Sequence, residues 1–146
     1  MPTYTVHAPA GRLDAGQRAR IAAEITRVHK EVTGAQTFFA QVLFVDVPAG
    51  HWFVGGKPMA HQHVFVYGQI RAGRSSELKT TLLVQLMAAV RAAAGLEPAQ
   101  AWGYIVDVEA SHMVEYGHVL PQPGSELQWL AALPAADRAL MESVGS

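Results

Sequence analysis

The sequence has no cysteine, little net charge and no long apolar run. Without cysteine, the chain can form neither a disulfide framework nor a thiolate site. Its 11 basic and 12 acidic residues give a formal net charge of −1, so it lacks the basic surface typical of proteins that bind nucleic acid or anionic membranes. No apolar stretch approaches the roughly 18 residues of a membrane-spanning helix, and the N-terminus lacks the regions of a signal peptide. We therefore expect a cytoplasmic protein without nucleic-acid or membrane partners.

The composition is typical of a compact globular protein. Of the residues, 50% are hydrophobic and 16% are charged, which is not the balance of a disordered chain. A chain of 146 residues can bury a substantial core without disulfides. We therefore expect residues 1–146 to form a single domain.

A weak internal repeat divides the chain. Gly11-Arg12 begins a stretch that ends in FVDVPA at residues 44–49, and Gly73-Arg74 begins another that ends in IVDVEA at residues 105–110. The offset is about 61 to 62 residues at both ends. The repeat predicts two halves, at about residues 2–50 and 62–110, and a C-terminal tail of residues 111–146.

Each half contains two segments with the composition of β-strands. Residues 3–8 alternate between polar and apolar side chains, and residues 64–70 are rich in β-branched and aromatic side chains. Residues 38–47 and 102–108 are apolar runs of similar composition. The sequence thus predicts four strands, two in each half.

A helical pattern lies between the two strand segments of each half. Apolar residues recur every three or four positions, which places them on one face of a helix. They are Ile21, Ile25, Val28 and Val32 in the first half, and Leu82, Leu83, Leu86, Met87 and Val90 in the second. Gly34 and Gly95 stand where helix C-caps are expected. Each half therefore predicts a β-α-β unit.

Two such units predict an α+β fold with one four-stranded sheet and both helices on one face. The strands are apolar at nearly every position, which is typical of strands buried on both faces. Because two helices cover only one face, we predict a homotrimer in which the sheets face a common core. Residues 51–60 predict a loop, and the turn-rich tail predicts a short helix at residues 135–143.

Pro2 is the first candidate for catalysis. If Met1 is removed after synthesis, Pro2 carries a secondary amine at the chain start, whereas every other proline nitrogen lies within an amide. The small second residue favours this removal. Such amines titrate at about pH 8, close enough to neutrality for general acid, general base or nucleophilic catalysis. The alternative is that Met1-Pro2 simply begins a strand.

Two arginines flank Gly73 at the predicted turn from strand to helix. Arg71 and Arg74 could direct two guanidinium groups at one anion beside a helix N-terminus, which itself favours anions. The carboxylate of a small organic acid fits this arrangement. The alternative is a pair of solvated surface arginines.

Three further candidates also have structural interpretations. His29 lies near the apolar face of its helix, where a histidine is commonly a partly buried core residue. Tyr104 is on an apolar strand and is explained as a core tyrosine with one hydrogen bond. Glu115 lies in an apolar segment, so its carboxylate is either exposed by a turn or paired.

The remaining histidines do not indicate a metal site. His61 and His63 share one face of an extended strand, but no third ligand has matching spacing. We therefore expect no metal and no cofactor. We interpret the others as surface or interface residues: His7, His51, His112 and His118.

Short segments along nearly the whole chain resemble the tautomerase superfamily, whose members begin with a catalytic proline, and most closely its cis-3-chloroacrylic acid dehalogenase group. The segments are Pro2-Thr3-Tyr4, His29, Gln41-Val42, RAGRS at residues 71–75, Tyr104, MVEYG at residues 113–117 and LPQPG at residues 120–124. The chain departs from the dehalogenase pattern at Ala35, where that pattern has threonine, and at Phe39, where it has leucine. Both positions are expected to border the pocket.

The resemblance implies a hydrolytic dehalogenase or hydratase of small unsaturated carboxylic acids. It implies that Glu115, assisted by Tyr104, activates a water that attacks C3 of a three-carbon acid, while protonated Pro2 delivers a proton to C2. A halohydrin then collapses to malonate semialdehyde with loss of halide. The implied ligands of the substrate carboxylate are Arg71, Arg74 and His29.

Two other activities remain open at this point. A keto-enol tautomerase acting on small 2-oxo acids could use the same residues, with neutral Pro2 as the base. A trimeric protein that binds carboxylates without turnover could retain Arg71 and Arg74 alone.

Overall fold

The structure is a computed structural model that describes residues 2–59 and 62–145. Met1 and His61 lie outside the described residues. The removal of Met1 and the pairing of His61 with His63 therefore stay predictions.

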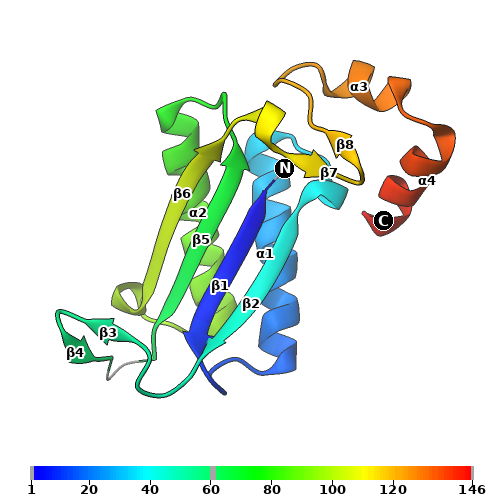
Figure 1. The fold of residues 1–146 in the computed structure, drawn as a ribbon. Helices are drawn as coiled ribbons and strands as arrows, with labels where there is room; N and C mark the ends of the chain where they lie inside the picture. The colour runs from blue at the N-terminus through cyan, green and yellow to red at the C-terminus, as the bar shows by residue number, and fades with distance from the viewer. Residues whose placement is uncertain (1, 60–61, 146) are drawn as a thin grey trace.

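Four strands form one mixed sheet in the order β2-β1-β5-β6 (Figure 1). They are β1 (Thr3–Pro9), β2 (Gln41–Val47), β5 (Val64–Arg71) and β6 (Ala101–Val108). β1 is parallel to β2 and β5 is parallel to β6, whereas β1 and β5 are antiparallel. The two halves are thus β-α-β units joined through their first strands, which confirms the predicted fold.

Local sequence signals define the ends of the two long helices, α1 (Ala15–Thr33) and α2 (Ser76–Ala94). Asp14 caps α1 by accepting a 2.7 Å hydrogen bond from the Gln17 backbone N–H, and Ser75 caps α2. Gly34 and Gly95 end the helices with φ of 73° and 66°, in the left-handed region where glycine carries no steric penalty. Both predicted C-caps are confirmed.

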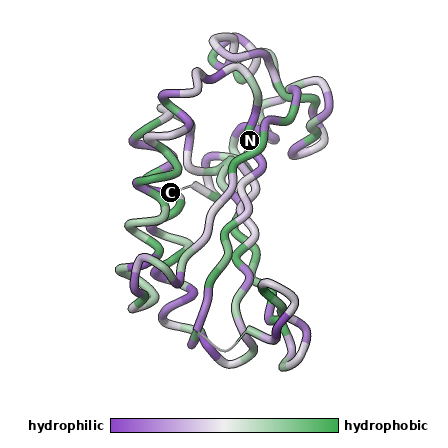
Figure 2. Tube along the Cα trace, turned by 90° about the vertical axis from the view of Figure 1, so that its left-hand side faces the viewer, coloured by the Kyte–Doolittle hydropathy of each residue, from purple (hydrophilic) through white to green (hydrophobic). Residues whose placement is uncertain are grey.

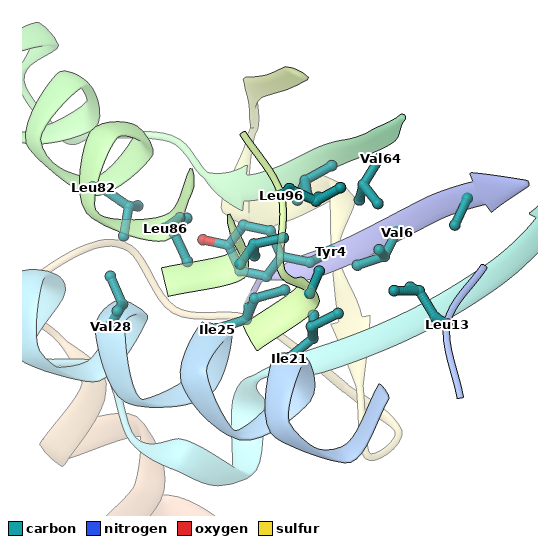
Figure 3. Packing of buried hydrophobic residues seen from close by; sticks show 14 of the residues in the cluster. Tyr4, Val6, Leu13, Ile21, Ile25, Val28, Val64, Leu82, Leu86 and Leu96 are labelled. Carbon is teal, nitrogen blue, oxygen red and sulfur yellow. The ribbon is translucent and has the colours of Figure 1, made fainter. Parts of the chain in front are cut away.

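The main core lies between the sheet and these helices, which cover one face of the sheet only (Figure 2). Alternate residues of β1, Tyr4, Val6 and Ala8, are buried there because side chains of a strand point to opposite faces in turn. Figure 3 shows Tyr4 packed with side chains of both helices. The helix residues buried in this layer include Ile21, Ile25, Val28, Leu82, Leu86 and Val90.

The opposite face of the sheet exposes large apolar side chains. Leu43 and Val45 on β2 are 45% and 40% exposed, and Trp102 and Tyr104 on β6 are 41% and 55% exposed. Several large exposed apolar side chains on one face of a sheet are typical of an interaction surface. The face therefore has the character of an interface.

The first strand after α1 is shorter than predicted. Phe38 and Phe39 belong to the 3₁₀ helix η1 (Thr37–Phe39), and β2 begins only at Gln41. Both rings pack in a second apolar cluster that is built mainly from the C-terminal tail. The other members of this cluster are Ala110, Met113, Tyr116, Leu120 and Trp129. An apolar run cannot show whether its side chains serve a strand or a separate cluster, so the prediction of a strand from residue 38 was wrong.

The loop and the tail contain short elements. In the loop, β3 (Phe53–Val54) and β4 (Lys57–Pro58) form a hairpin. The tail contains β7 (Val114–Glu115), β8 (His118–Val119), α3 (Glu126–Ala132) and α4 (Ala135–Val144). The 3₁₀ helix η2 (Pro98–Gln100) precedes β6, and η3 (Ala110–His112) follows it. Among the described residues, no helix is both long and apolar enough to cross a bilayer.

Candidate active site

Five of the six candidate residues lie at one end of the sheet. Because β1 and β5 are antiparallel, the start of β1 lies beside the end of β5. The N-terminus of α2 and the β7–β8 hairpin lie at the same end (Figure 1). The topology thus gathers Pro2, His29, Arg71, Arg74 and Glu115, although they span more than half of the sequence.

A cavity of about 640 Å³ opens at this end of the sheet. Its floor is formed by the neighbouring strand residues Thr3, Gln41 and Gln69, which are register partners on three adjacent strands. The other lining residues are Phe38, Phe39, Ala40, Val108, His112, Met113, Val114, Glu115, Tyr116 and Val144. Phe39 borders the cavity as expected, whereas Ala35 does not line it.

Pro2 is buried and does not itself line this cavity. Its carbonyl oxygen accepts a 3.0 Å hydrogen bond from the Gln41 backbone N–H, which extends the pairing of β1 with β2 by one residue. The next residue, Thr3, lines the cavity. The backbone therefore fixes the position of an amine at Pro2 relative to the cavity.

Glu115 lines the cavity from the β7–β8 hairpin. Tyr116 and Gly117, at the tip of this hairpin, have φ of 52° and 83°. Positive φ at both central residues is typical of a tight two-residue hairpin turn. The Tyr116 hydroxyl donates a 2.7 Å hydrogen bond to the Phe38 carbonyl oxygen, which ties the hairpin to η1. The Glu115 carboxylate is thus carried by a tethered turn.

His29 lies on α1 in the core layer behind Pro2 and is 2% exposed. Its Nδ1 is 2.7 Å from the Tyr4 hydroxyl, and its Nε2 is buried without a hydrogen-bond partner among the described residues. Burial and the nearby charge of Arg74 lower the pKa of His29 to about 3. The ring is therefore neutral at physiological pH.

Arg71 is the last residue of β5, and its side chain is only 3% exposed. Its Nη1 donates a 2.7 Å hydrogen bond to the Pro121 carbonyl oxygen, and its Nη2 forms a short ion pair with Glu126 of α3. Burial favours a raised pKa for Glu126, but the hydrogen bond and charge of Arg71 outweigh it and lower the pKa overall. Arg71 therefore ties the C-terminal tail to the sheet. The sequence did not indicate this structural contact, and the binding of one anion by both arginines stays a prediction.

Arg74 is half-buried in the turn between β5 and α2. Its Nη1 donates a 2.8 Å hydrogen bond to the Arg71 carbonyl oxygen, which uses one of its five N–H donors. Burial and the positive charge of Arg71 lower the pKa of Arg74. This pKa shift reports a desolvated cation close to Tyr4 and His29, which is the environment expected for an anion site.

Tyr104 does not join the other candidates within one protomer. It lies on the uncovered face of the sheet, four residues before the end of β6 at Val108, which is roughly 13 Å along a strand. Its ring contacts Phe65, and it lines a separate hollow with His7, Trp52 and Trp102. The structural interpretation of Tyr104 from the sequence was a buried core tyrosine, but its side chain is exposed in the structure.

Two residues that contact the candidates were not predicted. Tyr4 is the partner of His29, and its position on the alternating buried face of β1 is the sequence signal that could have indicated this contact. Glu126 is the partner of Arg71, and no local sequence signal indicates it. Within residues 2–59 and 62–145, no three histidine or carboxylate side chains are placed so that they could hold one metal ion together.

Comparisons with known proteins agree with this geometry. The profile of a family described as putative oxalocrotonate tautomerase enzyme matches residues 1–132. The crystal structure of N1, a member of the cis-3-chloroacrylic acid dehalogenase family, is 34% identical and superposes with a TM-score of 0.93 over 97% of this chain and 99% of that one. Native Ps01740 is 29% identical, with a TM-score of 0.72 over 77% of this chain and 99% of that one.

A more distant structure shows the fold alone. Native fused 4-OT is 23% identical, with a TM-score of 0.73 over 80% of this chain and 94% of that one. No curated protein sequence matches. With a family profile over most of its length and a 34% identical relative over nearly all of it, the chain belongs to the tautomerase superfamily, in the group related to cis-3-chloroacrylic acid dehalogenase.

Proposed function

We propose that this chain is a cofactor-independent enzyme that adds water to small unsaturated carboxylic acids and releases halide from substrates such as cis-3-chloroacrylate. One observation carries the proposal. Glu115 lines a cavity of about 640 Å³ together with Thr3, the residue after Pro2, and the desolvated cation of Arg74 lies near Tyr4 and His29 at the same end of the sheet. An amine, a carboxylate and a carboxylate-binding cation are the groups that hydration of such an acid requires.

The proposed reaction uses each group once. Glu115 takes a proton from water, and the resulting hydroxide forms a bond to C3 of the acid. The protonated amine of Pro2, after removal of Met1, delivers a proton to C2. With a 3-halo substrate, the halohydrin product loses hydrogen halide and becomes malonate semialdehyde.

The carboxylate of the substrate is proposed to bind beside the N-terminus of α2. Arg74 supplies the positive charge, and His29 supplies a neutral ring next to it. Arg71 supports this site from behind, because its guanidinium group is held by Pro121 and Glu126. An N-terminal helix end adds a favourable potential for an anion.

Tyr104 can assist Glu115 only from a neighbouring protomer. Its side chain lies on the uncovered face, four residues before Val108, which lines the cavity with Glu115, whereas Tyr104 does not line it. We propose that this face forms the core of a homotrimer and that the partner subunit's Tyr104 completes the site. The exposed apolar side chains of β2 and β6 supply the physical reason for assembly.

A keto-enol tautomerase is the second candidate. The matching family description, putative oxalocrotonate tautomerase enzyme, favours it. In this reaction a neutral Pro2 removes a proton from a small 2-oxo acid, and Glu115 is not required. A carboxylate-binding trimer without turnover is the outcome expected if neither activity is found.

The two arginines predict different variant phenotypes. Arg74→Ala should lower kcat/KM about 10- to 100-fold, because a charge-assisted hydrogen bond worth about 1.5–3 kcal/mol is lost. Arg71→Ala should also lower the free energy of unfolding by about 3 kcal/mol, since a buried cation with two partners is removed. Steady-state kinetics and thermal unfolding at one protein concentration measure both.

Arg18→Ala is the matched control. Arg18 pairs with Asp46 at 2.9 Å, but the two side chains are 33% and 45% exposed, so the loss should stay within about 0.2–1 kcal/mol. An unchanged kcat/KM in Arg74→Ala would show that Arg74 does not bind the substrate. A stability loss in Arg71→Ala no larger than that of the control would contradict its structural role.

The uncovered face predicts the oligomeric state. Sedimentation at micromolar concentration should give a stable trimer, and Leu43→Asp should dissociate it by placing a charge in the interface. Val84→Asp is the control. Val84 is 64% exposed on α2, and this helix lies on the opposite side of the sheet from the proposed interface. A wild-type monomer, or a Leu43→Asp protein that remains trimeric, would contradict the proposed interface.

A further inference from the structure

Tyr4 and His29 form an isolated buried pair behind the proposed active site. Tyr4 is completely buried, and its hydroxyl lies 2.7 Å from His29 Nδ1. In Figure 3 this hydroxyl points from β1 into the layer between sheet and helices. Gly68 also packs against the ring, because a Cβ atom at that position would be 2.6 Å from Tyr4 Cε1. The position of the tyrosine ring is thus fixed by its surroundings.

The hydrogen-bond inventory of the pair distinguishes the two neutral tautomers of His29. If Nδ1 carries the proton, it donates to Tyr4, and both the tyrosine O–H and the Nε2 lone pair are left buried without partners among the described residues. If Nε2 carries the proton, Tyr4 donates to Nδ1 and only the Nε2–H lacks a partner. Each unsatisfied buried group carries a free-energy penalty. The second arrangement has fewer of them.

We infer that Tyr4 is a positioning residue that donates to His29 Nδ1 and thereby fixes His29 as the neutral Nε2–H tautomer, so that Nε2–H donates to an anionic oxygen of the ligand. The assignment of that oxygen to a substrate carboxylate rests on the proposed function. The tautomer itself does not, because it follows from the buried pair alone.

The charges around the pair agree with this assignment. Burial is the main reason that the pKa of Tyr4 is raised, so its hydroxyl keeps the proton that it donates. The nearby cation, Arg74, disfavours a second positive charge on His29. The two residues would therefore contribute differently to ligand binding. Arg74 supplies a positive charge, and the neutral ring of His29 supplies an oriented N–H donor.

Nuclear magnetic resonance of the full chain labelled with ¹⁵N-histidine tests the tautomer without any substrate. His29 is identified among the seven histidines as the signal lost in His29→Gln. Between about pH 5 and pH 8, long-range ¹H–¹⁵N spectra should show a protonated Nε2 and a hydrogen-bonded, unprotonated Nδ1. In Tyr4→Phe, the Nδ1 signal should shift as that hydrogen bond is lost, whereas Tyr67→Phe on the opposite face should leave it unchanged.

A wild-type spectrum with Nδ1–H, an imidazolium at neutral pH, or an unchanged Nδ1 signal in Tyr4→Phe would overturn the inference. If the enzyme turns over an unsaturated acid, Tyr4→Phe should lower kcat/KM roughly tenfold, mainly through KM, because a wrongly oriented ring weakens ligand binding. If no acid is turned over, the proposed function fails, and the tautomer spectrum still decides the role of Tyr4.

Discussion

Replacing Glu115 with glutamine is expected to lower the rate of hydration by about 10²- to 10⁴-fold, the usual contribution of a general base. Glutamine has nearly the same shape but cannot accept a proton from water. The hairpin should remain folded, because its position depends on the Tyr116 hydroxyl and on backbone pairing. Keto-enol exchange, which requires only the Pro2 amine, should persist at least in part.

Glu109→Gln is the matched control for this experiment. Glu109 is exposed at the end of β6 and does not line the cavity, so both activities should be unchanged. Rates of both reactions are measured with the same protein preparations. Hydration that survives in Glu115→Gln would show that another group activates water.

Changing the amine itself is expected to affect every activity. Pro2→Ala leaves a primary amine but loses the ring that fixes its geometry, and both hydration and keto-enol exchange should fall by about 10²-fold or more. The pH dependence separates the two proton roles. If Pro2 is an acid, the active form is the cation, and hydration falls as pH rises through the pKa of the amine. If Pro2 is a base, activity falls as pH drops through that pKa.

The local pattern of the sequence explains most of the fold. Apolar residues at i and i+4 spacing placed His29 on the same helix side as Ile21 and Ile25, and the structure buries all three. The Gly-Arg turn placed Arg71 and Arg74 at the junction of a strand and a helix, and in the structure Arg71 ends β5 while Arg74 lies in the turn before α2. These signals are local, because they depend on helix and strand periodicity alone.

The environment of the site depends on long-range contacts that no local pattern encodes. Glu126 reaches Arg71 across 55 sequence positions, and this contact depends on where the short helix α3 packs. The alternation of β6 places Tyr104 on one face of the sheet, but it does not show whether a partner covers that face. For the same reason, the sequence could not separate the environment of Arg71, which is paired with Glu126, from that of Arg74, which has no such ion pair among the described residues.

The measurement that tests the central claim most directly compares two forms of the chain that differ only before Pro2. One form begins at Pro2, as verified by intact mass, and the other carries a single glycine ahead of it, which converts the amine into an amide. Both are assayed with cis- and trans-haloacrylates, propiolate and enolised phenylpyruvate. The account predicts turnover of at least one of these acids by the form that begins at Pro2 and no detectable turnover by the extended form. Equal turnover by both forms would contradict it.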